Sequence, residues 1–166
     1  GKHQMINAAA AIEALRRFSV EEPYIEAALK NAAVPARMEK LGGFLIDGAH
    51  NVSGAKAAAA LIGGQKGKKV LITGMLKSKD YKGALSELIP VFDYVVAVDF
   101  FSEEAVPAEE ILKLTDSLGR AGEIAAAPLE AIEAALRFQS ELKVVCGSLY
   151  LCGVMRREIL KLRPSC

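Results

Sequence analysis

The spacing of hydrophobic residues changes near residue 34 and divides the chain into two parts. In the first part Ile6, Ala10, Leu15 and Phe18 recur along one side of a helical repeat, with many alanines between them. Apolar residues spaced three to four positions apart are typical of an amphipathic helix. The pattern therefore predicts a helix over residues 3–18.

A second helix is predicted to follow directly and to end near Ala32. Ser19 can cap this helix, because Glu22 lies three residues further on and completes a capping box. Pro23 fits a first helical turn. Pro35 then breaks the pattern, since proline has no N–H to donate and restricts the residue before it. We therefore predict a domain boundary here, with residues 1–33 closing one domain and residues 34–166 forming a second.

After the boundary, short apolar runs alternate with segments of helical period. Gly42 and Gly43 separate two short extended segments, which predicts a hairpin. The later strands are continuous apolar runs, as expected where helices cover both faces of a parallel sheet. The pattern predicts an α/β fold, a three-layer α/β/α sandwich around a mostly parallel sheet. The predicted strands cover residues 38–40, 44–46, 70–73, 94–98, 123–125 and 143–146, and the predicted helices cover residues 53–62, 81–89, 108–118, 129–138 and 150–162.

The charge balance and the cysteines narrow the class of protein. Lys and Arg number 21 against 20 Asp and Glu, so the basic excess that binding to a nucleic-acid backbone requires is missing. The 3 cysteines have no metal or redox spacing, which suits a reducing cytoplasm better than a disulfide framework. No run of about 18 apolar residues or signal-peptide segment is present. We expect a cytoplasmic protein without a nucleic-acid or membrane partner.

Most of the predicted parallel strands run into glycine or polar residues. The carboxyl ends of parallel strands lie along one edge of the sheet, and ligands bind at that edge. A polar loop that opens onto a helix N-terminus also favours anions. We therefore expect an anion or nucleotide site at this edge, built from the segments Asp47 to Asn51, Gly74 to Asp80 with Lys77 and Lys79, Asp99-Phe100-Phe101-Ser102 and Gly147-Ser148.

The residue types suggest individual roles at this edge. Asp47 can accept hydrogen bonds from ribose hydroxyls or orient a neighbouring base. His50 can donate to a phosphate oxygen, because histidine changes charge near neutral pH. Arg37 is the only arginine near this loop in sequence, and a planar guanidinium suits phosphate oxygens.

Structural interpretations of the same residues stay open. Asp47 with Gly48 is a common turn pair, Asp99 and Ser148 can cap helices, and the two lysines can belong to a solvated loop. Ser53 can cap the helix that follows. The sequence has no GxGxxG after a strand, no GxxxxGK[ST] and no GxSxG. The chain therefore lacks the usual apparatus for binding a nucleotide alone.

Four segments, in this order, match motifs of one known family. Residues 47–51 read DGAHN and residues 147–151 read GSLYL. Residues 1–8 are similar to a GxHQxxNA helix, and residues 35–39 are similar to a PGRxE segment, with Ala36 in place of the usual glycine. Val52 stands where a proline commonly follows DGAHN. The chain resembles the folylpolyglutamate synthase and dihydrofolate synthase family of the Mur ligase superfamily, which implies its Rossmann-like C-terminal domain preceded by the last helices of the central domain.

The resemblance implies an ATP-dependent amide ligase. A carboxylate of dihydropteroate or a folate attacks the γ-phosphate of ATP, and L-glutamate then displaces phosphate from the acyl phosphate. ATP and Mg²⁺ are implied as cofactors, bound mainly by an N-terminal ATPase domain of the same polypeptide. The chain begins without methionine and looks like a piece of a longer protein. We therefore expect a monomer that is inactive as a fragment.

The resemblance also implies roles for individual residues. Arg37 and His50 are expected to be catalytic and, with Asp47 and Asn51, to bind the nucleotide. No metal ligand is expected. The remaining residues are expected to face the substrates: Ser148, Gln4 and Asn7.

Several functions stay open at this point. The enzyme can be a dihydrofolate synthase, a folylpolyglutamate synthase or both. The chain can also be a stand-alone nucleotide-binding or regulatory module, or the C-terminal domain of a peptidoglycan-precursor Mur ligase.

Overall fold

The structure is a computed structural model that describes residues 2–99 and 103–162, and the side chains from residue 5 onward. The chain forms two compact units, residues 1–35 and residues 36–166. The division falls two positions after the boundary predicted between residues 33 and 34. The assignment of the first helices to a preceding domain stays a prediction.

The first unit is a pair of helices, α1 (Lys2–Arg17) and α2 (Glu22–Asn31), which contact each other. The predicted capping box between them is wrong. Ser19 has φ 58°, and its N–H donates to the carbonyl of Arg16 at 2.9 Å, so it terminates α1. The N-cap of α2 is Glu21, which makes no side-chain cap. Glu22 forms an ion pair with Arg16 instead of reaching back to the cap.

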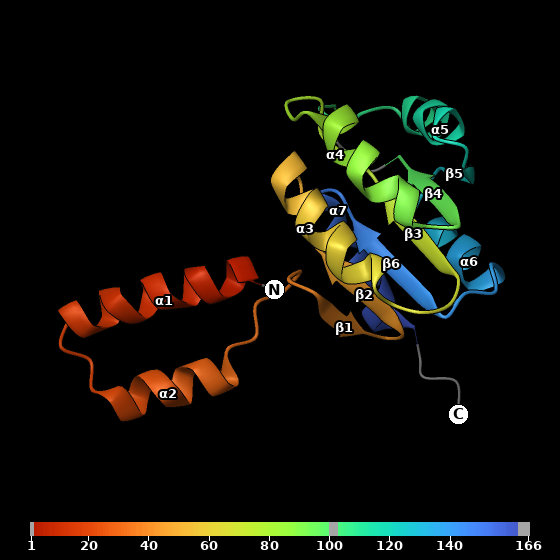
Figure 1. The fold of residues 1–166 in the computed structure, drawn as a ribbon. Helices are drawn as coiled ribbons and strands as arrows, with labels where there is room; N and C mark the ends of the chain where they lie inside the picture. The colour runs from red at the N-terminus through yellow and green to blue at the C-terminus, as the bar shows by residue number, and fades with distance from the viewer. Residues whose placement is uncertain (1, 100–102, 163–166) are drawn as a thin grey trace. The chain divides into compact units, whose positions relative to one another are not determined.

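The second unit is built on one six-stranded sheet (Figure 1). The β1–β2 pair is antiparallel and the other pairs are parallel, as predicted. The turn of the antiparallel hairpin is made by Gly42 and Gly43 at φ 54° and 82°, a conformation that glycine adopts without a steric penalty. The strand order is β1-β2-β6-β3-β4-β5, for β1 (Glu39–Leu41), β2 (Phe44–Asp47), β3 (Lys69–Thr73), β4 (Tyr94–Val98), β5 (Ala121–Ala125) and β6 (Leu142–Cys146).

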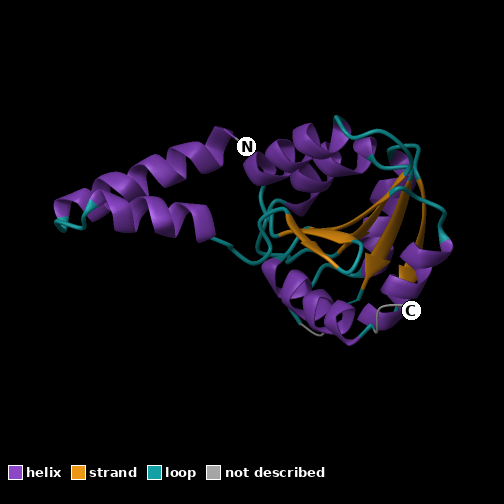
Figure 2. Ribbon diagram, turned by 90° about the horizontal axis from the view of Figure 1, so that it is seen from below, coloured by secondary structure: helices purple, strands orange, loops and turns teal. Residues whose placement is uncertain are grey.

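Helices cover both faces of the sheet, and the predicted three-layer α/β/α sandwich is confirmed (Figure 2). One core cluster joins α3, α4 and α5 to one face, and the other joins α6 and α7 to the opposite face. None of the helices in the described part of the chain is long and apolar enough to cross a membrane. The helices are α3 (Val52–Gly63), α4 (Tyr81–Leu88) with the short 3-10 helix η1 (Ile89–Val91), α5 (Ala108–Ser117), α6 (Pro128–Arg137) and α7 (Leu149–Lys161).

The strand order places three predicted site segments side by side. The last strand in sequence, β6, lies between β2 and β3, with Asp47 opposite Cys146 and Ile72 opposite Val145. The carboxyl ends of these three parallel strands therefore meet at the centre of one sheet edge. The loops after them begin at Gly48, Gly74 and Gly147.

Candidate functional site

The carboxylate of Asp47 fixes the loop that follows β2. Its Oδ1 accepts from the backbone N–H of Ala49 at 2.9 Å, and its Oδ2 accepts from the backbone N–H of Met38 at 2.9 Å. The residue is only 8% exposed. Each oxygen of an ionised carboxylate has a second acceptor position. Asp47 therefore stabilises the loop and can still accept hydrogen bonds from a ligand.

His50 is held in one tautomer by its own loop. The imidazole Nδ1 lies 3.0 Å from the carbonyl oxygen of Gly48. A carbonyl oxygen only accepts hydrogen bonds, so Nδ1 carries the proton in this contact. In the neutral ring Nε2 is then an acceptor, and it becomes a donor to a phosphate oxygen only in the imidazolium.

Asn51 caps the helix that the loop enters. Its Oδ1 accepts from the backbone N–H of Gly54 at 2.8 Å, and its own backbone is extended, with φ −143° and ψ 167°. The predicted cap by Ser53 is wrong, because Ser53 already lies inside α3, which begins at Val52. An N-cap needs an extended backbone.

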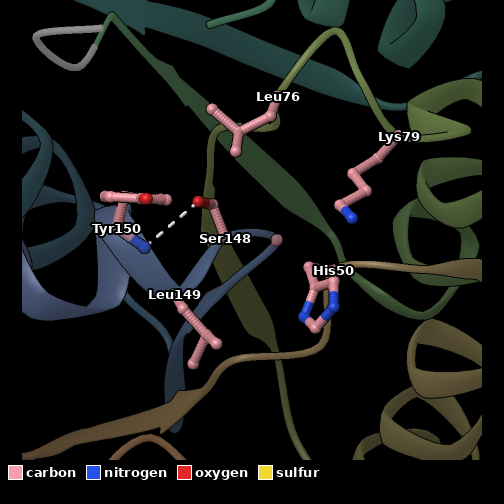
Figure 3. Close-up of a pocket in the computed structure, with 7 residues that line it drawn as sticks. His50, Leu76, Lys79, Ser148, Leu149 and Tyr150 are labelled. Carbon is pink, nitrogen blue, oxygen red and sulfur yellow. Dashed lines mark hydrogen bonds between the residues drawn. The ribbon is translucent and has the colours of Figure 1, made fainter. Parts of the chain in front are cut away.

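A pocket of about 140 Å³ lies where the three central loops meet (Figure 3). The buried hydroxyl of Ser148 accepts from the backbone N–H of Tyr150 at 3.2 Å and caps α7, as one sequence interpretation predicted. The hydroxyl proton of Ser148 remains available to a ligand. His50 and the start of α7 thus line the same pocket, whose lining residues are His50, Leu76, Lys79, Gly147, Ser148, Leu149 and Tyr150.

The two lysines of the second loop have different surroundings. Lys77 directs its Nζ to the carbonyl oxygen of Glu103, 3.0 Å away. Lys79 lines the pocket, and in Figure 3 its side chain extends on the same side of the pocket as His50. Both lysines are exposed, which agrees with a solvated loop, and Lys79 in addition lines the pocket. The sequence carries no signal that separates Lys79 from Lys77, because both lie in the same polar loop after β3.

Arg37 lies in a strained turn beside the loop. Ala36 and Met38 adopt φ 53° and 52°, a region that costs non-glycine residues about 1–3 kcal/mol each. This conformation explains why glycine is usual where the chain has Ala36. A Cβ on Gly48 would lie 3.1 Å from Nη1 of Arg37 and would clash with Leu149. Gly48 therefore lets the guanidinium and the first residue of α7 lie close against the loop.

Two buried thiols contact the backbone of the 47–51 loop. Cys152 donates to the carbonyl oxygen of Asp47 at 3.3 Å, and Cys146 lies 3.9 Å from the carbonyl oxygen of Ala49. Burial raises the pKa of Cys152 to about 12 and the pKa of Cys146 well above its usual value. Both thiols therefore stay protonated and act as donors. Among residues 2–99 and 103–162, no cluster of His, Cys, Asp or Glu side chains could hold a metal ion.

The remaining predicted residues belong to the first unit, are absent from the pocket lining or are outside the described residues. Asn7 is exposed on α1, in the first unit, and the side chain of Gln4 is outside the described part. Asp99 accepts from the backbone N–H of Ala108 at 3.0 Å, at the start of α5. Phe100, Phe101 and Ser102 are outside the described residues.

Comparison with known proteins identifies what the chain is similar to. The family model for the dihydrofolate synthetase C-terminal domain matches residues 31–161. A Schizosaccharomyces pombe protein described as a probable dihydrofolate synthetase is 32% identical over 96% of this chain and 43% of its own length. Escherichia coli FolC in complex with DHPP and ADP superimposes on 96% of this chain and 39% of its own, with 27% identity and a TM-score of 0.82.

A second solved structure is also similar to this chain. The Mycobacterium tuberculosis folylpolyglutamate synthase complexed with ADP and AMPPCP is 26% identical, with a TM-score of 0.84, over 96% of this chain and 40% of its own. The chain thus spans less than half the length of these relatives.

Proposed function

Since this chain belongs to the family of dihydrofolate synthetase C-terminal domains, we propose that it is the C-terminal part of an ATP-dependent amide ligase. The ligase adds L-glutamate to dihydropteroate, to a folate, or to both. This proposal agrees with the names of the relatives, among them a probable dihydrofolate synthetase and a folylpolyglutamate synthase bound to ADP.

The observation that carries the proposal is the convergence of His50, Lys79 and the N-terminus of α7 on one pocket. A helix N-terminus and an ammonium group both favour a negatively charged ligand. α7 has 13 residues and no acidic side chain in its first turn. The pocket therefore suits a carboxylate or a phosphoryl group. Amide ligation uses both groups, since a carboxylate is first phosphorylated and then joined to an amine.

The proposed ligation has two steps. The substrate carboxylate attacks the γ-phosphorus of ATP, which gives an acyl phosphate and ADP. The amine of L-glutamate then attacks the acyl carbon, and the C–O bond to phosphate breaks to give the amide, phosphate and a proton. With Nδ1 bonded to Gly48, Nε2 of neutral His50 can accept that proton. Protonated His50 can donate from Nε2 to the departing phosphate.

The nucleotide is assigned to the neighbouring loop residues. Arg37 would contact the phosphates, Asp47 the ribose through its unused acceptor positions, and Asn51 the nucleotide through its amide nitrogen. Ser148 and Lys79 would hold a carboxylate of L-glutamate. Most of the rate enhancement would come from positioning charged groups in a site that excludes water.

Mg²⁺ does not fit the residues described here, because no group of candidate ligand side chains occurs among them. We assign Mg²⁺ and most ATP contacts to an ATPase domain that precedes this chain in the same polypeptide. Gln4 and Asn7 would face the substrates from the last helices of that domain. We further propose that the ligase is a monomer and that it is located in the cytoplasm.

The test is an assay of the complete protein with ATP, L-glutamate and either dihydropteroate or tetrahydrofolate. We expect ADP release that depends on glutamate, with a product heavier by one glutamyl residue in mass spectrometry. Glutamate addition to a cell-wall precursor alone would instead favour the peptidoglycan ligase. Tight ATP binding by the isolated chain, without ligation by the complete protein, would favour a stand-alone nucleotide-binding module.

A further inference from the structure

The turn that carries Arg37 is fixed to the 47–51 loop at two points. The backbone N–H of Met38 donates to Asp47 at 2.9 Å, and the backbone N–H of Gly48 donates to the carbonyl oxygen of Ala36 at 2.8 Å. Ala36 and Met38, on either side of Arg37, both adopt positive φ angles. A strained conformation of this kind persists only where surrounding contacts hold it. The orientation of Arg37 therefore depends on the contacts of the turn.

The carboxylate of Glu39 supplies a third contact. Its Oε2 accepts from the backbone N–H of Ala36 at 3.0 Å, which closes the turn around Arg37. Its Oε1 accepts from Nε of Arg156 on α7 at 2.9 Å. The Glu39 side chain is 19% exposed and that of Arg156 is 38% exposed. This partly buried pair ties the turn to the helix whose N-terminus lines the pocket.

We propose that Glu39 and Arg156 are positioning residues that hold Arg37 in its ligand-binding orientation. None of Arg37, Glu39 and Arg156 is among the residues that line the pocket. Glu39 and Arg156 act on Arg37 through the contacts of the turn. The inference rests on the proposed function, in which Arg37 contacts the phosphates of ATP.

A double-mutant cycle on the complete protein tests the proposal, with the dissociation constant for ATP measured in the presence of Mg²⁺. Glu39→Gln keeps the size of the side chain but leaves one acceptor oxygen for two donors, the backbone N–H of Ala36 and Nε of Arg156. We expect it to weaken ATP binding about tenfold when Arg37 is present. We expect no further weakening in the Arg37→Ala background, since there is then no guanidinium to position. KM for ATP should rise more than kcat falls.

Arg156→Gln gives a second test that leaves the Glu39–Ala36 bond in place, and it should weaken ATP binding less than Glu39→Gln. Arg157→Ala, at the next and exposed position of α7, is the matched control and should leave ATP binding unchanged. Equal weakening by Glu39→Gln with and without Arg37, or no weakening by either variant, would overturn the inference. If Arg37→Ala itself leaves ATP binding intact, the proposed function of Arg37 fails instead.

Discussion

The imidazole Nδ1 of His50 donates to the carbonyl oxygen of Gly48, 3.0 Å away in the same loop. This bond directs the ring so that Nε2 is the nitrogen available to a ligand in the pocket that His50 lines. The loop thus selects the tautomer of the residue before any substrate binds.

Replacing His50 by alanine should slow amide formation by the complete protein roughly 10²–10⁴-fold, the usual contribution of a proton-transferring side chain. The fold should survive, because His50 is only half-buried and is not a residue of the hydrophobic core. Steady-state kinetics and thermal denaturation measure the two effects. Turnover equal to that of the wild type would refute the assignment of His50.

The lysine pair offers a matched comparison in the same assay. Lys79→Ala should raise KM for glutamate, because Lys79 lines the pocket. Lys77→Ala should not, because Lys77 bonds the carbonyl of Glu103 instead. Equal effects of the two substitutions would mean that only the charge of the loop matters.

Glu39 should make stability depend on pH. The backbone N–H of Ala36, and then Arg156, hold the pKa of Glu39 below its usual value. A depressed folded pKa stabilises the protein above the unfolded pKa of about 4.3, and this stabilisation is lost as the pH falls through the folded value. The free energy of unfolding of the wild type should exceed that of Glu39→Gln at pH 7, and the difference should shrink below about pH 4. Urea denaturation at several pH values checks this, and a difference that grows in acid would contradict it.

Gly147, the residue after β6, should not tolerate a side chain. Its φ is 130°, and a Cβ would lie 2.6 Å from Oγ1 of Thr73 and 2.9 Å from the carbonyl oxygen of Gly74. Gly147→Ala should lower the free energy of unfolding by about 1–3 kcal/mol from backbone strain alone. Gly153→Ala in α7 is the control, since its Cβ would meet no atom within 4 Å. It should stabilise the helix by about 0.5–1 kcal/mol. Thermal denaturation should separate the two variants in opposite directions.

Asn51 should show two separable roles. Asn51→Ala removes the bond to Gly54 and should cost about 1 kcal/mol of stability. Asn51→Asp keeps an acceptor oxygen for the cap but loses the amide nitrogen, so it should preserve stability and weaken ATP binding by the complete protein. If Asn51→Asp binds ATP like the wild type, Asn51 is a helix cap only.

Two N-caps were predicted at the wrong residue, because a serine lay close to the start of each helix. Ser19 and Ser53 both looked like N-caps, but Ser19 ends α1 at a positive φ and Ser53 lies inside α3. Which residue caps a helix depends on where the extended backbone turns helical. That point is set by the preceding loop and is not encoded in the capping residue itself; for α3 it places Asn51 at the N-cap.

The residue pattern alone predicted the layers, because continuous apolar runs such as those of β3 and β4 are typical of strands between two covering layers of helices. It also identified residues 47–51 as a polar loop opening onto a helix. The position of β6 between β2 and β3, which brings Ser148 and Lys79 to the pocket of His50, depends on how the folded chain packs. The pairing of Glu39 with Arg156, 117 positions apart, depends on that packing as well. Strand order and ion pairs between distant elements follow from packing the whole chain, and no local pattern of residues carries that information.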